Sequence, residues 1–261
     1  MTGLTRRQLV WGGAAGVLGI SAAGAAWELS GSEAFPEFRP RFGADGLVTN
    51  EWAFRNPHGP RAHESPDWVV TSGSLFASGG LGWTGLPDAG KTGPDSGAAD
   101  DSAVFRLASR RRDFGPVAVS FKVRLQPPIT TARTPEKDWD GGHVWLRYHS
   151  PQELYALSFR RRDGVVVIKR KVPSHKATAV QGGDYTTVAE SSHAISYGDW
   201  HRVEAHAVNT VSGVLLRLVI NGKQVLHTID HTPGPLATPG GVGLRVDNSE
   251  LWFGNFLARS A

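Results

Sequence analysis

The sequence predicts an all-β protein whose antiparallel strands form two stacked sheets, and two observations carry that prediction. Glycine and proline together make up 48 of the 261 residues, which suits many short elements joined by tight turns. Nearly every readable segment after residue 47 alternates apolar and polar side chains, which is the period of a strand. Ten or more such strands in one domain require a closed barrel or two packed sheets, and the long glycine-rich excursions favour two sheets.

The individual strands are expected wherever short runs are rich in Val, Leu, Phe and Tyr. In chain order these runs are residues 101–109, 116–125, 143–150, 153–162, 164–172, 200–208, 213–220, 223–229, 241–246 and 250–258. Turn residues separate them, as in Arg162-Asp163-Gly164, Tyr197-Gly198-Asp199 and Asn221-Gly222. Since Asp-Gly and Asn-Gly tolerate positive φ, we expect the strands on either side of each such pair, Asp163-Gly164 and Asn221-Gly222, to form hairpins.

Residues 1–27 are predicted to be an export signal. Arg6 and Arg7 stand in a polar opening segment, a Gly- and Ala-rich apolar stretch follows, and Ala23-Gly24-Ala25 supplies a small-x-small cleavage site. The string from Thr5 to Val10 resembles the twin-arginine pattern, so we expect a secreted protein. The apolar stretch is too short and glycine-rich to favour a stable membrane span after processing. The alternative is an uncleaved anchor, which also places the body of the protein outside.

The rest of the chain is predicted to be one domain with an N-terminal extension. Residues 28–46 have prolines, alternating charge and no periodicity, and are expected to form a linker or an N-terminal arm. Residues 47–261 are expected to form one β-sandwich domain, and we expect a monomer. The absence of cysteine excludes disulfides, thiol nucleophiles and thiolate metal sites. Removing two signal arginines from a net charge of +4 leaves +2, so charge alone predicts no nucleic-acid partner.

Three segments resemble the concanavalin A-like superfamily. Residues 197–229, with Trp200, Val203 and Leu218 followed by the Asn221-Gly222 turn, are similar to a segment of concanavalin A-like jelly rolls and laminin G domains. Residues 67–78 with 109–125 resemble the opening of the superfamily's sugar-active and sugar-binding members, and residues 240–258 resemble its last two strands. This resemblance implies a jelly-roll sandwich over about residues 46–261. It does not imply one activity, because that architecture hosts lectins, carbohydrate-binding modules, glycoside hydrolases and polysaccharide lyases.

Hydrolysis by paired carboxylates is disfavoured. Retaining glycosidases of this resemblance carry a Glu-x-Asp-x-x-Glu strand, which fixes two carboxylates about 5 Å apart on one face. The chain has no such string. Its acidic pairs, Asp100-Asp101 and Asp138 with Asp140, lie in predicted loops, where no strand fixes their spacing.

The segment 143–149 carries the strongest functional signal. If Val144, Leu146 and Tyr148 face the core, then strict alternation places four side chains on the opposite face, namely His143, Trp145, Arg147 and His149. The neighbouring strand adds Arg160 on that side, and the next strand adds Lys169 and Lys171. Between residues 143 and 176 there are eight Lys or Arg and two acidic residues, so positive charge is concentrated there.

This face supports three hypotheses. In the leading one, the protein binds a polysaccharide, with Trp145 stacking on a sugar ring while Arg147 and Arg160 pair with carboxylate or sulfate. In the second it is a polysaccharide lyase, in which His143 or His149 abstracts a ring proton and Arg147 neutralises the uronate, as the resemblance implies. The third is an adhesion or scaffold domain of the cell envelope. The alternative to all of them is a solvated sheet face without a ligand.

Other residues are ranked lower as site candidates. Trp83 and Trp139 have glycine-rich flanks and are expected to bind glycan from loop tips, whereas Trp68 and Trp200 are expected in the core. No cofactor is required. The scattered histidines argue against catalytic zinc, while Asp45 and Asp247 are candidate ligands of a structural calcium ion.

Overall fold

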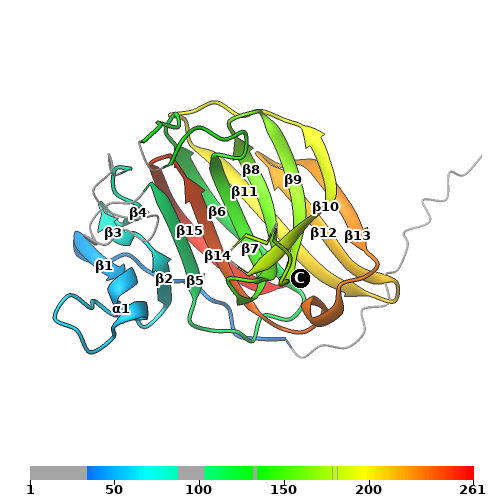
Figure 1. Ribbon diagram of the computed structural model, residues 1–261, viewed down its shortest axis with the longest axis horizontal. Coiled ribbons are helices and arrows are strands. Elements are labelled where there is room, and N and C mark those ends of the chain that lie inside the picture. The colour runs from blue at the N-terminus through cyan, green and yellow to red at the C-terminus, as the bar shows by residue number, and fades with distance from the viewer. Residues whose placement is uncertain (1–33, 88–102, 132–133, 178, 181) are drawn as a thin grey trace, which may run out of the picture.

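Two antiparallel sheets packed face to face make up the molecule, as the alternating segments predict (Figure 1). The computed structural model describes residues 34–87, 103–131, 134–177, 179–180 and 182–261. The predicted signal segment and the Asp100-Asp101 pair therefore lie outside the described residues. In the part of the chain that is described, no helix has the length and apolar character needed to cross a membrane.

The eight-stranded sheet has the order β1-β3-β4-β15-β6-β11-β12-β13. Its strands are β1 (Gly46–Asn50), β3 (Ser74–Ser78), β4 (Leu81–Trp83), β6 (Val117–Leu125), β11 (His201–Thr210), β12 (Gly213–Ile220), β13 (Lys223–Asp230) and β15 (Leu251–Ser260). The chain enters this sheet several times, so strands distant in sequence lie next to each other, as β6 does between β15 and β11.

The seven-stranded sheet has the order β10-β9-β8-β7-β14-β5-β2. Its strands are β2 (Trp68–Ser72), β5 (Val104–Ser109), β7 (Gly141–Ser150), β8 (Glu153–Arg161), β9 (Val165–Pro173), β10 (Gly183–Ser192) and β14 (Gly241–Asp247). Helix α1 (Glu51–Arg55) and the 3-10 helix η1 (Gly234–Ala237) complete the described elements. The sequence predicted neither helix, because one or two turns are too short to show a helical period.

The core lies between the two sheets and follows the predicted alternation. Strand β8 directs Tyr155, Leu157 and Phe159 inward, and β6 directs Val119 and Phe121 toward them. In Figure 1 strands β7 and β8 lie over β11 and β12 of the other sheet, where contacts join the two layers. The outer face of each sheet can be covered by loops, solvent or a ligand.

The turns form hairpins in two places, as predicted, and a connection between the sheets in a third. Asn221 and Gly222 both have positive φ and join β12 to β13, and Arg162-Asp163-Gly164 joins β8 to β9. The segment at Tyr197-Gly198-Asp199 separates two strands, as its turn residues predict, but does not join them as a hairpin. It leads from β10, at the edge of one sheet, to β11 in the other, because the intervening chain crosses between layers.

The segment before β1 packs on the sandwich. Phe38 exchanges two backbone hydrogen bonds with Ala258 of β15, at 2.9 and 3.0 Å. Its ring is buried edge-on against Trp68 and lies beside Phe114 and Phe256. This aromatic cluster fixes the described part of the segment along the core.

A β-bulge in β7 reverses the predicted facing of Arg147 and Tyr148. Arg147 adopts a positive φ of 51°, and the pairing of β7 shifts register at this point against both neighbouring strands. One extra residue moves every later side chain to the other face of the sheet. Arg147 therefore points into the interior, and Tyr148 points outward, where it stacks on Trp145 with ring centroids 5.2 Å apart.

Inside the sandwich, Arg147 ties the two sheets together. Its guanidinium donates to the carbonyls of Phe114 and Thr238, both at 3.2 Å, and to Oδ1 of Asn209 in β11 at 2.8 Å. Burial lowers the pKa of Arg147 to about 10, so the group remains charged at neutral pH. The three acceptors compensate that charge without a carboxylate.

We expect Arg147→Met to reduce the free energy of unfolding by about 2–4 kcal/mol, because it removes three hydrogen bonds that a buried guanidinium makes between the two sheets, to Asn209 Oδ1 and to the carbonyls of Phe114 and Thr238. Equilibrium denaturation measures this change. The exposed Arg39→Ala serves as the control and is expected within about 0.5 kcal/mol of the parent protein. Equal stability of Arg147→Met and Arg39→Ala would contradict the interior role of Arg147.

Candidate functional site

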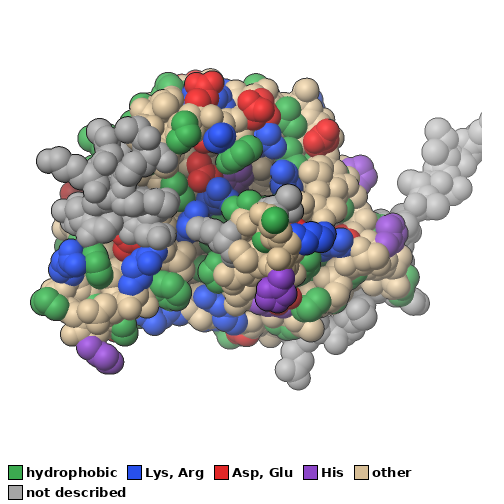
Figure 2. Space-filling model, in the orientation of Figure 1, with side chains coloured by type: hydrophobic (Ala, Val, Ile, Leu, Met, Phe, Trp, Pro, Cys, Tyr) green, Lys and Arg blue, Asp and Glu red, His purple; other side chains and the backbone are tan. Residues whose placement is uncertain are grey.

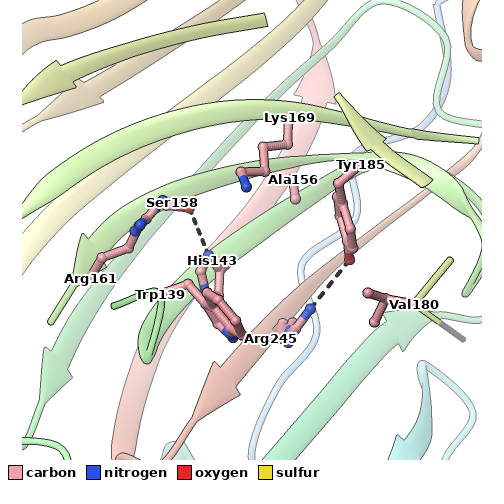
Figure 3. Close-up of a pocket in the computed structure, with 9 residues that line it drawn as sticks. All are labelled: Trp139, His143, Ala156, Ser158, Arg161, Lys169, Val180, Tyr185 and Arg245. Carbon is pink, nitrogen blue, oxygen red and sulfur yellow. Dashed lines mark hydrogen bonds between the residues drawn. The ribbon is translucent and has the colours of Figure 1, made fainter. Parts of the chain in front are cut away.

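A pocket of about 240 Å³ lies on the outer face of the seven-stranded sheet (Figure 3). Four central strands and β10 contribute to it, so its floor is made of outward-facing strand residues. It is lined by Trp139, His143, Ala156, Ser158, Arg161, Lys169, Val180, Tyr185 and Arg245. None of these lining side chains is acidic, whereas three of them are cationic.

A chain of polar contacts crosses the floor of this pocket from β8 to β10. Ser158 Oγ lies 2.8 Å from His143 Nδ1, and His143 Nε2 lies 3.5 Å from Asp247 Oδ2. Arg245 donates to both oxygens of Asp247, at 2.7 and 3.0 Å. Its remaining nitrogen donates to the Tyr185 hydroxyl oxygen at 3.2 Å. Figure 3 shows the two ends of this chain, with His143 facing Ser158 and Arg245 facing Tyr185.

The charge states of this network follow from its burial. Burial lowers the pKa of His143, which outweighs the opposing attraction of Asp247, and the ring is neutral at pH 7. Burial acts against ionisation of Asp247, but Arg245 and His143 hold the pKa of that carboxyl well below its usual range. Arg245 and Asp247 thus form a charged pair. The neutral ring of His143 lies beside this pair and is hydrogen-bonded to Ser158.

Lys169 differs from the other cations of this region. Within the described residues no carboxylate lies within ion-pair distance of its ammonium group, whereas Arg161 pairs with Asp163 and Arg245 pairs with Asp247. Burial, and then the nearby Arg161, lower the pKa of Lys169. Glu190 and Asp163 attract the Lys169 ammonium group only from beyond ion-pair distance, so Lys169 brings to the pocket a positive charge without a direct carboxylate partner among the described residues.

Trp139 stands at the rim of the pocket and joins it to a second hollow. Its side chain is 46% exposed, and Lys137 Nζ lies 5.9 Å from the ring centroid. The second hollow, of about 170 Å³, shares Trp139 and Arg245 with the first and extends toward Arg106 and Lys137. It is also lined by Asp140 and Asp247, whose carboxylates pair with Arg162 and Arg245. Figure 2 shows this face of the molecule, with Lys and Arg side chains gathered around its centre. The two hollows form one groove with an exposed aromatic side chain at their junction.

Trp145 does project from the outer face of β7, as predicted, but it is only 2% exposed. It is packed in a small apolar cluster with Tyr148, Leu154 and Ala156, and Tyr185 lies against that cluster. The predicted stacking of Trp145 on a sugar ring is therefore wrong in this structure, because its faces are already covered. The cluster supports the groove from below.

The other members of the predicted constellation do not meet in the pocket. Arg147 is interior, and His149 lies toward the far end of β7, where its ring contacts Glu153 at 2.9 Å and the Pro239 carbonyl at 3.0 Å. Arg160 lies over the ring of Tyr197, with its guanidinium carbon 4.0 Å from the centroid, and does not line the pocket. Of the predicted catalytic trio of His143, Arg147 and His149, only His143 reaches the pocket.

The predicted tryptophans are divided between the two sheets. Trp139 lines the groove, but Trp83 belongs to β4 of the eight-stranded sheet, where it stacks on Trp252. Trp68 is buried as predicted, whereas Trp200 is 40% exposed, so the prediction that it lies in the core is wrong. It stands before β11, outside the inward-facing run that begins at Val203.

The two candidate calcium ligands lie in different places. Asp45 precedes β1 and accepts a hydrogen bond from the backbone of Gly79 at 2.8 Å. Asp247 ends β14 in the other sheet and has both oxygens bonded to Arg245. Across the described ranges, no group of three or more potential metal ligands is assembled. The two residues thus do not form a single site, and calcium binding stays a prediction.

Sequence reasoning missed the central roles of Tyr185 and Arg245. Tyr185 belongs to β10, whose many Ser and Thr residues hid its strand character. Arg245 and Asp247 are two positions apart in a strand that was predicted correctly, and this spacing places them on one face. This spacing of an arginine and an aspartate could have predicted an ion pair on one face of β14.

Comparisons with known proteins report the following likenesses. No protein-family model and no curated protein matches the chain. A carbohydrate-binding module, CBM66 from Bacillus subtilis, is 12% identical with a TM-score of 0.49, covering 74% of this chain and 95% of that one. An alginate lyase variant in complex with an alginate tetrasaccharide is 14% identical, with a TM-score of 0.47 and coverages of 86% and 97%. An endo-1,3-beta-glucanase from Streptomyces sioyaensis is 12% identical, with a TM-score of 0.45 and coverages of 88% and 100%. The two packed antiparallel sheets of the structure itself confirm the predicted sandwich fold class.

We expect the pKa of His143 to lie below its ordinary value of 6.5, because burial disfavours the charged ring and the nearby Arg245 and Arg161 add a smaller effect in the same direction. Nitrogen-15 NMR of the imidazole ring, recorded from pH 8 to pH 4, measures this pKa. Since the pKa is lowered by folding, the contribution of His143 to stability is full above pH 6.5 and is lost as the pH falls through the folded-state pKa. A pKa of His143 at or above 6.5 would contradict the neutral state.

Proposed function

We propose that the protein binds an acidic polysaccharide in the groove of the seven-stranded sheet. The observation that carries the proposal is Lys169, a cation without a carboxylate partner in the described structure, in a pocket whose lining has no acidic side chain. A carboxylate or sulfate group entering the pocket would meet that charge. A charge-assisted hydrogen bond to Lys169 then compensates the removal of both groups from water.

The form of the groove favours a polymeric sugar over a small free anion. Its two hollows adjoin at Trp139 and Arg245, so a ligand longer than one ring can occupy both. Trp139 offers an exposed aromatic surface on which a pyranose ring can stack, and Tyr185 and Val180 add apolar area beside Lys169. The site therefore combines stacking surface with positive charge, as an acidic glycan requires.

The proposal includes the export of the protein and a monomeric state. The twin-arginine pattern at Arg6 and Arg7 supports export in the folded state, for which a chain without cysteine is suited. The polysaccharide would then belong to the cell envelope or the surroundings of the cell.

We expect Lys169→Ala to weaken binding of a uronate polymer about tenfold or more, because it removes the uncompensated charge. Trp139→Ala is expected to weaken it by a similar factor through lost stacking. Isothermal titration calorimetry with polygalacturonate, alginate and a neutral glucan provides the measurement. Lys223→Ala removes an exposed cation at the start of β13, on the other sheet, and is the matched control. Equal affinity for the neutral glucan, or an equal loss in the control, would count against the proposal.

A second candidate function, β-elimination of a uronate polymer, is favoured by the contact between Arg245 and Tyr185. Arg245 donates to the Tyr185 hydroxyl oxygen, and Lys169 Nζ lies 6.0 Å from the centroid of the same ring, so the one phenol among the described residues that line the pocket lies beside two cations. In this reaction Lys169 would neutralise the uronate carboxylate and Tyr185 would take the ring proton beside it. The electron pair forms a carbon–carbon double bond, while the glycosidic C–O bond breaks and its oxygen takes up a proton.

For this second candidate we expect absorbance at about 235 nm to rise when the protein is incubated with a uronate polymer, since the unsaturated product absorbs there. Tyr185→Phe is expected to abolish the rise while keeping binding within about threefold of the parent protein, because the ring remains. Tyr197→Phe, outside the pocket, is the control. Binding without any rise in absorbance would leave the protein a binding module.

A further inference from the structure

The outer face of the eight-stranded sheet carries a continuous row of aromatic and cationic side chains. Three directly opposed pairs link the first four strands of this row: Phe76 with Trp83, Trp83 with Trp252, and Trp252 with Arg124. The fifth member, Trp200, immediately precedes β11, the next strand in the sheet. We call these five residues the aromatic row.

Neighbouring members of the aromatic row are in contact. The centroids of Phe76 and Trp83 are 5.5 Å apart, and those of Trp83 and Trp252 are 5.0 Å apart in a stacked geometry. The Arg124 guanidinium lies 5.5 Å from the centroid of Trp252 and 5.1 Å from that of Trp200. Stacking and cation–π contacts thus continue from one end of the row to the other.

The row is also held in a fixed orientation. The indole nitrogens of Trp83 and Trp252 both donate to Oε1 of Glu250, at 2.8 and 2.7 Å. Glu250 is therefore committed to the two indoles. A set of aromatic side chains that is already ordered loses little conformational entropy when a ligand binds.

The chemistry along the row resembles that of the groove on the opposite face. Trp200 is 40% exposed, and Lys122 Nζ lies 4.8 Å from its ring centroid. No carboxylate of the described chain lies within ion-pair distance of Lys122 or Arg124, because Glu250 bonds the indoles and Glu204 pairs with Arg202. Exposed aromatic surface and two uncompensated cations thus occur side by side.

From these observations we propose that the aromatic row is a second binding surface for an acidic polysaccharide. The row crosses five strands, which at the usual strand spacing gives a length of about 19 Å, enough to contact several sugar units. The groove lies on the seven-stranded sheet and the row on the eight-stranded sheet, so one molecule can hold two separate glycan chains. The protein thereby bridges polysaccharide chains.

The charges favour a glycan over a second copy of the protein. In a symmetric dimer through this face, Lys122 and Arg124 of one copy would be buried close to the same cations of the other. Burying like charges without partners is unfavourable, whereas a carboxylated or sulfated chain supplies the missing negative charge.

A bridging assay tests the proposal. Beads carrying a uronate polymer are mixed with the full chain and then with a fluorescent soluble chain of the same polymer, and fluorescence retained on the beads measures bridging. Trp200→Ala removes the exposed end of the row, with Phe54→Ala as the control for loss of an exposed aromatic residue elsewhere, at 53% exposure. Thermal unfolding of each variant verifies that it is folded.

We expect Trp200→Ala to reduce bridging at least fivefold, while calorimetric affinity at the groove changes less than twofold. Phe54→Ala is expected to bridge as the parent protein does. Undiminished bridging by Trp200→Ala, or an equal loss in Phe54→Ala, overturns the second surface. Sedimentation velocity without glycan tests whether this face is a protein interface instead. A dimer of the parent protein that dissociates in Trp200→Ala would overturn the glycan surface.

The groove proposal is tested separately by the same assay. If Lys169→Ala leaves the affinity unchanged while Trp200→Ala removes binding, the groove proposal fails and the second surface stands. If Lys169→Ala removes binding and Trp200→Ala has no effect, the groove stands alone. Loss of bridging in both variants supports the two surfaces together.

Discussion

The bidentate ion pair between Arg245 and Asp247 determines the arrangement of the groove. Asp247 is buried and Arg245 is partly buried on the outer face of one strand, where an unpaired charge would be unfavourable. Arg245 donates to both oxygens of Asp247 and neutralises its charge. The carboxylate can therefore lie beside a neutral His143. The free nitrogen of Arg245 then positions Tyr185 from β10. Pocket residues from β7 and from β10 thus both contact this one pair. The pair contributes no net charge, which leaves Lys169 as the pocket cation without an ion-pair partner among the described residues.

The fold as a whole was predictable because alternation in a sandwich is enforced by a two-sided core. Strands such as β6 and β8 reveal their inward residues directly, and turns such as Asn221-Gly222 mark the hairpins. The functional face was less predictable, because one bulge at Arg147 reverses the side chains that follow it. Alternation from Leu146 predicted an outward arginine and an inward tyrosine, and the reverse is observed. A bulge in β7 leaves no clear mark in its sequence, since the residue with positive φ is an arginine and not a glycine.

The candidate site was predictable in its strand and charge but not in its members. His143 was identified because it stands in an alternating strand, and Trp139 because glycines follow it. Tyr185 escaped notice in a strand rich in Ser and Thr, and Trp200 was assigned to the core because tryptophan near a strand start is usually buried. Tertiary contacts decide both cases: Tyr185 is positioned by Arg245 from a distant strand, and Trp200 by Arg124 and Lys122 of β6.

Local charge in the sequence and available charge in the structure are different quantities. The basic segment between residues 143 and 176 is largely neutralised by acids that the fold brings from elsewhere: Asp230 pairs with Arg170, Asp140 with Arg162 and Asp184 with Lys176. Lys171 is buried with a pKa lowered to about 8 and donates to the carbonyl of Pro151. Among the cations that line the pocket, Lys169 is the one without an ion-pair partner in the described structure. We therefore expect an anionic ligand to bind where a cation has no carboxylate partner within the described fold. On the opposite sheet, Lys122 and Arg124 meet the same criterion.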